Sequence, residues 1–220
     1  MPNEYLYFYF YRDRAVSSIL KSGKTRGETI LEINQDMQKK LMQMDIDKDF
    51  DTAFHCFMEH YVMRENNYFS IESGEMRKDQ ISVPTLEEFL NAPENGSYAS
   101  VALDFMKARQ GGKPVHMVLS VPNGGAVPFL HPEDVCELSC TVTKEEVLPD
   151  AAPPVPKSLQ NLILTVKSYE NLTVEAILEK SRSKAIEALL LHPLVFSYPL
   201  AEKLVDAYLA AYHAYTGDWT

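Results

Sequence analysis

The stretch "VKSYENLTVEAILEKSRSKAIEALLLHPLVFSYPLAEKLVDAYLAAYHAY", Val166–Tyr215, decides how the chain folds. Apolar side chains recur in it three or four positions apart, as they do on the buried face of an α-helix. The pair His192-Pro193 interrupts this pattern, because a proline disfavours helix at the residue before it. Pro199 suits the first turn of a new helix. The last third of the chain is therefore predicted to hold separate helices around 159–169, 174–178, 185–190 and from 199 onward.

Two strands are expected before this helical third. Val115–Val121 is short and apolar, and Val135–Thr143 alternates in part and is β-branched near its end. Between them, Pro122-Asn123-Gly124-Gly125 is typical of a turn. Lys144–Ser158 is rich in proline, so we expect a loop with neither helix nor strand pairing there.

The stretch "YLYFYFYRDR", Tyr5–Arg14, is ambiguous. Strict alternation of tyrosine with Leu or Phe up to Tyr11 fits a strand, whereas Val16, Ile19 and Leu20 continue it at helical spacing. We favour a helix. Aromatic residues dominate cores and interfaces, so their plain interpretation is core packing or an oligomer contact.

Further helices are predicted from capping and spacing. Thr25-Arg-Gly-Glu28 has the pattern of a capping box and opens a helix that reaches Met44. Asp51–Arg64 and Ser97–Arg109 also have helical spacing. The segment between them is polar and is interpreted as a surface excursion with a short helical patch at Leu86–Leu90.

These elements predict an α+β fold, with long helices around a small, largely antiparallel sheet. We expect a single domain over residues 1–220, with 50–96 as a divergent excursion. The net charge of −10 gives no sign of a nucleic-acid partner. No apolar run approaches the roughly 20 residues of a membrane span. Three cysteines, odd in number, suit a reducing compartment, so we expect a cytoplasmic protein.

Two metal motifs are considered and not favoured. The acidic run at 45–51 resembles a calcium loop, but Phe50 stands where that loop needs glycine and Cys56 where it needs glutamate. The group His55, Cys56, Glu59 and His60 lies on one predicted helix, yet further zinc ligands are not apparent. The chain also lacks a Gly-x-Gly-x-x-Gly fingerprint and a Walker A sequence, so we assign no cofactor-binding and no metal residues to it.

Arg26 is the most informative charged residue. The capping box places it in the first turn of a helix, where free N–H groups and the helix dipole favour an anion. A guanidinium there adds a planar fork that matches phosphate. A phosphate-binding arginine and an exposed surface arginine both remain open from the residues alone.

Four segments together resemble family 4 glycoside hydrolases, especially their 6-phospho-β-glucosidases. They are "EYLYFYFYRDRAV", "KTRGETILEI", "VPNGGAVPFLHPEDVCELSC" and the closing stretch quoted above. The resemblance covers the C-terminal half of that family, whose C-terminal domain is related to those of lactate and malate dehydrogenases. It implies a missing N-terminal Rossmann half that binds NAD and a divalent metal, usually manganese. Met1 then resembles an internal start, a split gene or a trimmed chain.

The resemblance also implies roles for individual residues. Tyr5, in Tyr-Leu-Tyr-Phe-Tyr, matches the family's catalytic base, which removes the proton from sugar carbon 2 after NAD has taken a hydride from carbon 3. Free tyrosine has a pKa near 10, so about one part in a thousand is phenolate at pH 7, and a nearby cation would be needed to raise that share. Arg26 matches the arginine that binds the sugar 6-phosphate. Asn123 lies in a turn that resembles a possible substrate loop.

Two hypotheses follow from this. In the first, the chain is the substrate-binding and base-carrying part of a 6-phospho-β-glucosidase, inactive until a Rossmann half joins it in cis or in trans. In the second, it is a non-catalytic module that oligomerises or holds a phosphorylated sugar. We expect a homo-oligomer in either case.

Overall fold

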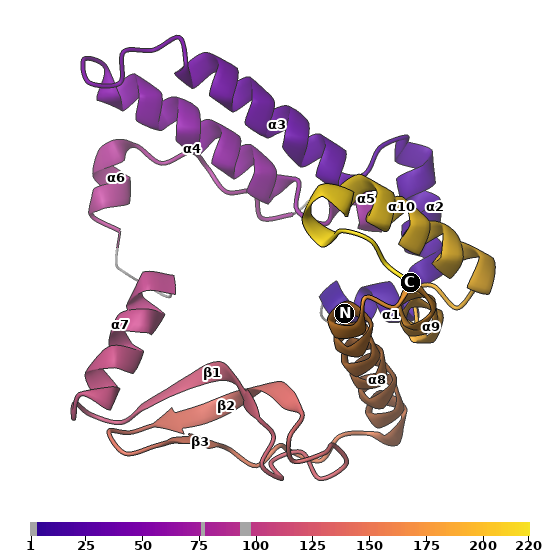
Figure 1. Cartoon of the computed structure of the whole chain (residues 1–220). Helices are drawn as coiled ribbons and strands as arrows, with labels where there is room; N and C mark the ends of the chain where they lie inside the picture. The colour runs from indigo at the N-terminus through magenta and orange to yellow at the C-terminus, as the bar shows by residue number, and fades with distance from the viewer. Residues whose placement is uncertain (1–3, 76–77, 93–97) are drawn as a thin grey trace. The chain divides into compact units, whose positions relative to one another are not determined.

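The computed structural model describes residues 4–75, 78–92 and 98–220, with the side chains of Glu4 and Tyr5 outside the description. Its contacts cluster in two units, residues 1–93 and residues 94–220, and each is described by itself (Figure 1). The single domain expected over 1–220 stays a prediction. None of the helices in the described ranges is both long and apolar enough to span a lipid bilayer.

The first unit begins with the two short helices α1 (Glu4–Phe10) and α2 (Arg12–Ser22). The helical interpretation of the tyrosine run is therefore confirmed over the strand. Tyr11 lies between the helices with φ −121° and ψ 31°, yet its N–H still donates to the Tyr7 carbonyl at 2.8 Å. The chain thus turns at Tyr11 without losing a hydrogen bond, and Tyr7 and Ala15 are buried.

Helices α3 (Arg26–Leu41) and α4 (Phe50–Asn66) form the long pair of the first unit and lie side by side (Figure 1). The capping box is confirmed, since the Thr25 side chain accepts from the Glu28 N–H and the Glu28 carboxylate accepts from the Thr25 N–H. His60 of α4 is buried, and its Nε2 lies 2.9 Å from Asp36 Oδ2 of α3. Hydrogen bonds from His60 and then Lys40 lower the pKa of Asp36.

The segment after α4 differs in part from the surface excursion that was predicted. The short helix α6 (Leu86–Leu90) is confirmed. The helix α5 (Ser70–Ser73) was not predicted, and it packs against α2. Ser18 Oγ donates to the Ile71 carbonyl at 2.6 Å, and the Glu72 side chain is only 8% exposed. Residues near 70 are therefore part of the packed interior of this unit.

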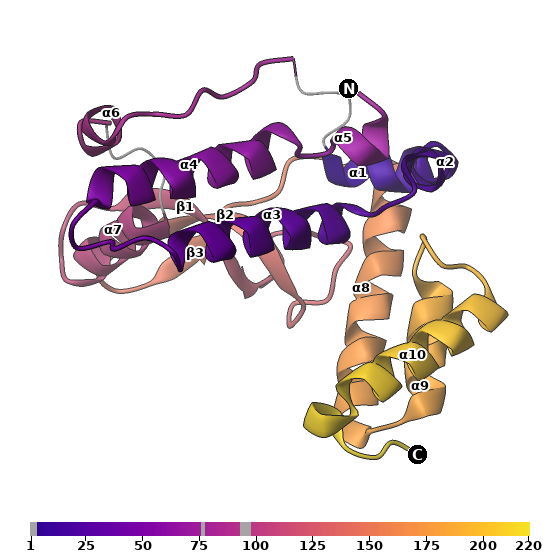
Figure 2. The ribbon, with the colours of Figure 1, turned by 90° about the horizontal axis from the view of Figure 1, so that it is seen from above.

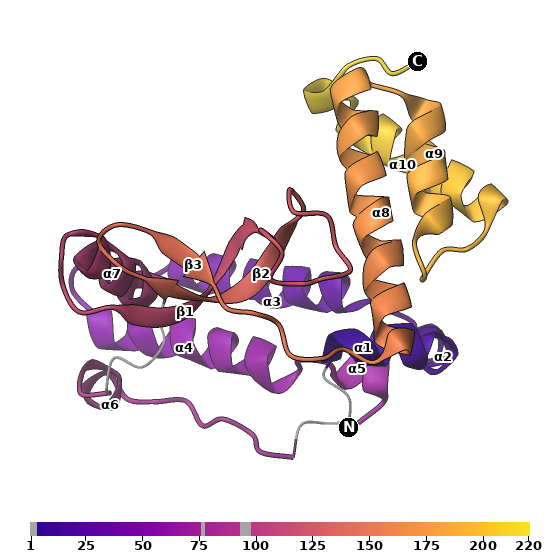
Figure 3. The same cartoon turned by 90° about the horizontal axis from the view of Figure 1, so that it is seen from below.

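The second unit begins with α7 (Tyr98–Arg109) and a three-stranded antiparallel sheet in the order β1 (Val115–Pro122), β2 (Val135–Val142) and β3 (Val147–Pro149) (Figure 3). The two predicted strands are confirmed. The prediction that Lys144–Ser158 holds no strand is wrong, because Val147 pairs with Val142. A tight turn brings the two together, with the Thr143 N–H donating to the Glu146 carbonyl at 2.9 Å. Pro149 ends this edge strand, a position that tolerates proline.

Three helices close the chain: α8 (Lys157–Glu179), α9 (Arg182–Leu191) and α10 (Tyr198–Thr216). α9 packs against both of the others (Figure 2). Two separate helices were predicted where α8 runs unbroken; Thr173 lies inside it, and its hydroxyl donates to the Tyr169 carbonyl at 2.7 Å. The stop before Pro193 and the start at Pro199 are confirmed. The core of this group is Ile186, Val195, Ala201 and Val205.

Candidate functional site

Arg26 is the first residue of α3 and is half-buried. Its guanidinium carbon lies 4.1 Å from the centre of the Tyr68 ring, which is a cation–π contact. Among the described residues no carboxylate lies within ion-pair distance of Arg26. A ring that covers one face of a guanidinium leaves its in-plane N–H donors available for an anion. This geometry suits the phosphate-binding role predicted for Arg26, which itself stays a prediction.

The start of α3 offers an anion less than the sequence alone suggested. The Glu28 carboxylate already accepts hydrogen bonds from the Thr25 N–H at 2.7 Å and the Thr25 hydroxyl at 2.8 Å. Those bonds lower the pKa of Glu28, so it is charged at neutral pH. A negative charge therefore sits in the turn that was expected to attract one. An anion bound here would therefore depend on the guanidinium more than on the helix start.

Tyr68 belongs to a turn that the sequence reasoning missed. After α4 ends, Phe69 adopts the left-handed conformation with φ +63°, which is strained for an aromatic residue. The Phe69 ring lies 4.7 Å from the ring of Tyr7 and 5.5 Å from that of Phe8, both on α1. The neighbouring rings of Tyr68 and Phe69 thus contact Arg26 and α1 respectively. Asn67 before them and Gly74 after them are turn signals that could have marked the segment.

Tyr5 lies in α1, but its side chain is outside the described part of the chain. Its role as catalytic base therefore stays a prediction. Tyr7, on the same helix, anchors α1 to the rest of the unit. Its ring stacks on that of Tyr11 at 5.3 Å, and its hydroxyl lies 3.4 Å from the Glu72 carbonyl oxygen. One oxygen of the Glu72 carboxyl group, Oε2, is buried and has no hydrogen-bond partner within the described ranges.

Asn123 is completely buried and organises the loop between β1 and β2. Its Oδ1 accepts from the Val127 N–H at 2.7 Å, and its Nδ2 lies 3.0 to 3.2 Å from the carbonyl oxygens of Val127, Leu130 and His131. The amide is thus fully used within the loop. Asn123 shapes the loop, and contact of that loop with a substrate stays a prediction.

The histidines and cysteines of the described part form no metal cluster of three or more ligands. Both ring nitrogens of His60 face oxygens, since Nδ1 lies 2.6 Å from the Cys56 carbonyl and Nε2 lies 2.9 Å from Asp36. Burial raises the pKa of the Cys136 and Cys140 thiols, which keeps them neutral at pH 7. Within the described ranges these side chains form no group of metal ligands, and the ring of His60 is already hydrogen-bonded.

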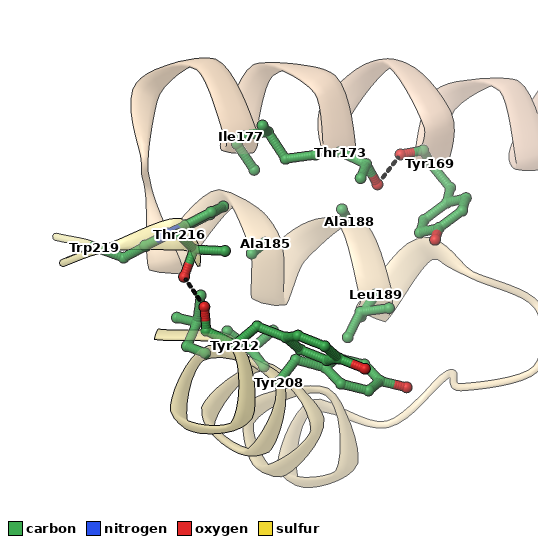
Figure 4. Close-up of a pocket in the computed structure, with 13 residues that line it drawn as sticks. Tyr169, Thr173, Ile177, Ala185, Ala188, Leu189, Tyr208, Tyr212, Thr216 and Trp219 are labelled. Atoms are coloured by element: carbon green, nitrogen blue, oxygen red, sulfur yellow. Dashed lines mark hydrogen bonds between the residues drawn. The ribbon is translucent and has the colours of Figure 1, made fainter. Parts of the chain in front are cut away.

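An apolar pocket of about 310 Å³ lies among α8, α9 and α10 in the second unit (Figure 4). Tyr169, Tyr208, Tyr212 and Trp219 supply its aromatic side chains. Its two threonine hydroxyls donate to backbone carbonyls within their own helices, Thr173 to Tyr169 and Thr216 to Tyr212. No charged side chain lines the pocket, so it does not suit a phosphorylated sugar.

A family model, the family 4 glycosyl hydrolase C-terminal domain, matches residues 1–195. This chain belongs to glycosyl hydrolase family 4. This chain is 25% identical over 219 residues to the 6-phospho-beta-glucosidase BglT of Thermotoga maritima, and the match covers 90% of this chain and 52% of that protein. It is 27% identical over 147 residues to a probable 6-phospho-beta-glucosidase of Bacillus subtilis, covering 66% and 32% of the two. The resemblance seen in the sequence is thereby confirmed.

Solved structures of family 4 enzymes have the same fold. A structure of the Thermotoga maritima 6-phospho-beta-glucosidase with NAD and glucose-6-phosphate matches 97% of this chain and 42% of that one, at a TM-score of 0.65 and 20% identity. A 6-phospho-alpha-glucosidase from gut microorganisms, in complex with NAD and Mn²⁺, matches 60% of this chain and 30% of that one, at a TM-score of 0.51 and 25% identity. The predicted fold class is confirmed. The chain spans about half or less of the length of these relatives.

Proposed function

We propose that the chain is the substrate-binding and base-carrying part of a cytoplasmic 6-phospho-β-glucosidase, which hydrolyses 6-phosphoglycosides by oxidation and elimination. The observation that carries the proposal is the Arg26 guanidinium, stacked on Tyr68 and without a carboxylate partner among the described residues, within a chain whose relatives are named 6-phospho-beta-glucosidases. A fork of N–H donors that is not already neutralised is what a phosphate group needs.

Each role is assigned to a residue of this chain. Arg26 binds the 6-phosphate and thereby fixes the sugar relative to α1. Tyr5, on α1, takes the proton from sugar carbon 2. A positioned base of this kind contributes about 10²- to 10⁴-fold to a rate. The loop built around Asn123 lies against the substrate.

The described residues do not fit NAD or a metal ion, because they include neither a glycine-rich phosphate cradle nor a cluster of metal ligands. Family 4 structures contain both groups. We therefore assign NAD and a divalent metal, manganese in those structures, to the Rossmann half, which acts in cis or in trans, and derive no step through them. The isolated 220-residue chain is expected to be inactive.

The test is reconstitution. The chain is mixed with the N-terminal half of a related family 4 6-phospho-β-glucosidase, NAD, Mn²⁺ and nitrophenyl 6-phospho-β-glucoside, and a folded complex is verified by sedimentation. We expect nitrophenol release that Tyr5→Phe lowers at least 100-fold. The matched variant Tyr11→Phe, which removes a hydroxyl from a half-exposed ring near the same helix, keeps the rate. A verified complex that releases no nitrophenol, or that works equally well with Tyr5→Phe, overturns the proposal.

A second function is favoured by one observation. Large apolar side chains are exposed on α8, including Leu178 at 80%. A module that oligomerises and holds a phosphorylated sugar without turnover would use such a surface. Sequencing the genomic DNA upstream of the Met1 codon separates the two, since an in-frame Rossmann sequence favours the enzyme and a genuine stop codon with no such half nearby favours the module.

A further inference from the structure

The turn that follows α4 contacts both elements to which the proposed function assigns chemistry. Tyr68 covers one face of the Arg26 guanidinium at 4.1 Å. Phe69, the next residue, packs edge-on against Tyr7 and Phe8 of α1 at 4.7 and 5.5 Å. Adjacent side chains of one turn thus contact the arginine and the helix that carries Tyr5.

This turn is held firmly in place. Ser18 Oγ of α2 donates to the Ile71 carbonyl at 2.6 Å, and the Ser70 hydroxyl donates to the Asn67 carbonyl at 2.8 Å. Gly74 ends α5 with φ +72°, and a Cβ there would lie 3.1 Å from Ser18 Oγ. The strained φ of +63° at Phe69 persists because these anchors on both sides leave the backbone no freedom to relax.

We propose that Tyr68 is a positioning residue for the phosphate-binding arginine, and that the Tyr68–Phe69 turn sets the spacing between Arg26 and α1. The proposal rests on the proposed function, since it takes the ligand to be a sugar phosphate. An arginine side chain has about 2 kcal/mol of rotamer entropy to lose when it is ordered. Stacking on Tyr68 orders the side chain before the ligand arrives, so less of that entropy opposes binding.

The spacing has a consequence for specificity. Arg26 and Tyr5 must engage the same sugar, one at its 6-phosphate and the other at carbon 2. On these assigned roles, a turn that fixes both elements should favour a sugar phosphorylated at carbon 6 over one phosphorylated at carbon 1. Tyr68 and Phe69 therefore contribute to selection of the phosphate position without taking part in the chemistry.

The test titrates the 220-residue chain with glucose 6-phosphate, glucose 1-phosphate and glucose, followed by ¹⁵N NMR of the Arg26 Nε–H. In Tyr68→Leu, the resonance loses its aromatic ring-current shift. The affinity for glucose 6-phosphate falls about fivefold, which corresponds to the free energy of a partly exposed cation–π contact. Tyr68→Phe keeps a ring and stays within about twofold of wild type. The matched control Tyr61→Leu removes an exposed tyrosine of α4 and leaves the affinity unchanged.

The outcomes are distinguishable. If wild type binds glucose 6-phosphate and Tyr68→Leu binds it equally well, the positioning role of Tyr68 is wrong, while the phosphate role proposed for Arg26 is not contradicted. If wild type, correctly folded, binds none of the three sugars, the phosphate role within the proposed function fails. In that case the chemical shift of the Arg26 Nε–H still tests Tyr68→Leu. A shift equal to that of wild type would show that the Tyr68 ring does not stack on the Arg26 guanidinium. Equal binding of the 1- and 6-phosphates overturns the spacing role.

Discussion

At the scale of single residues, Asn123 has four side-chain hydrogen bonds to lose. Asn123→Ala removes the acceptor of the Val127 N–H and the donor that serves three carbonyl oxygens. Buried backbone groups left without partners are costly, so we expect a loss of about 2–4 kcal/mol in the free energy of unfolding. Urea denaturation followed by circular dichroism measures it.

The control for this prediction is Asn161→Ala, which truncates an exposed asparagine on α8 and should change the free energy of unfolding by less than about 0.5 kcal/mol. Asn123→Asp keeps the size of the side chain but places a carboxylate oxygen against the carbonyls. It should regain part of its stability on acidification, when that oxygen becomes a donor. A wild-type unfolding curve for Asn123→Ala would contradict the assigned role.

His192 gives a pH dependence with a definite sign. Burial lowers its pKa below the ordinary value of about 6.5, its ring packs edge-on against Tyr169 at 4.6 Å, and its Nδ1 accepts from the Leu194 N–H. As pH falls, the unfolded chain therefore binds the proton at a higher pH than the folded chain. The stability that comes from burying neutral His192 is fully present above the ordinary pKa and is lost as pH falls through the folded pKa. Thermal unfolding between pH 7.5 and 5 should show a smaller decline in His192→Asn than in wild type.

His55→Asn serves as the comparison for that experiment, since His55 is an exposed histidine of the first unit. Its decline between pH 7.5 and 5 should match that of wild type. Parallel curves for His192→Asn and wild type would show that the burial of His192 does not matter for stability.

The structural roles of single residues were predictable where a local sequence motif determines them. The Thr25 capping box and the start at Pro199 depend on neighbours within four positions, so the sequence alone sufficed for both. Tyr68 and Phe69 were missed because their partners, Arg26 and α1, lie more than 40 positions away in the chain. Contacts that distant leave no periodic trace in a single sequence.

At the scale of secondary structure, α8 ends at a residue with a strained backbone conformation. Lys180 is its C-cap, with φ +51°, a left-handed conformation that costs about 1–2 kcal/mol for a residue with a side chain. Lys180→Gly removes this strain, less the larger entropy of glycine in the unfolded chain. The free energy of unfolding should rise by about 0.5–1 kcal/mol in chemical denaturation.

The matched variant for Lys180→Gly is Lys180→Ala, which loses the same attraction to Asp218 but keeps a Cβ in the strained conformation. It should show no gain in stability. An equal gain in both variants would assign the effect to the lysine charge and not to the backbone.

Elements were predictable in type and less so in length. The period of 3.6 indicated all of the long helices, but one polar interval at 170–173 was interpreted as a break within α8. Leu172 and Thr173 in that interval are half-buried, and packing of this kind keeps α8 continuous there. The strand β3 escaped prediction because its proline-rich surroundings indicated a loop, whereas a tight turn after β2 pairs three of its residues with that strand.

At the scale of the whole molecule, the exposed apolar surface predicts self-association. Val174, Ile177 and Leu178 share one face of α8 and are 55%, 55% and 80% exposed. Patches of this kind mark interaction surfaces. We expect sedimentation velocity to show association at concentrations of tens of micromolar, strengthened by salt because the chain carries a net charge of −10.

Leu178→Glu should weaken that association, because it places a charge at the centre of the patch. Leu20→Glu changes a leucine of α2 that is 75% exposed and should leave the association unchanged. A wild-type chain that sediments as a monomer throughout, at low and high salt, would contradict the prediction.

The capping box at the start of α3 affects the long-range electrostatic attraction of anions to Arg26. The Glu28 carboxylate offsets the Arg26 charge beyond a few ångströms, and the overall charge is strongly negative. If Arg26 binds phosphate as proposed, an approaching phosphate would be repelled until it reaches the guanidinium, where close hydrogen bonds would hold it. Unlike a lysine-rich anion funnel, whose grip weakens as ions are added, this protein would take up its ligand faster in a saltier solution.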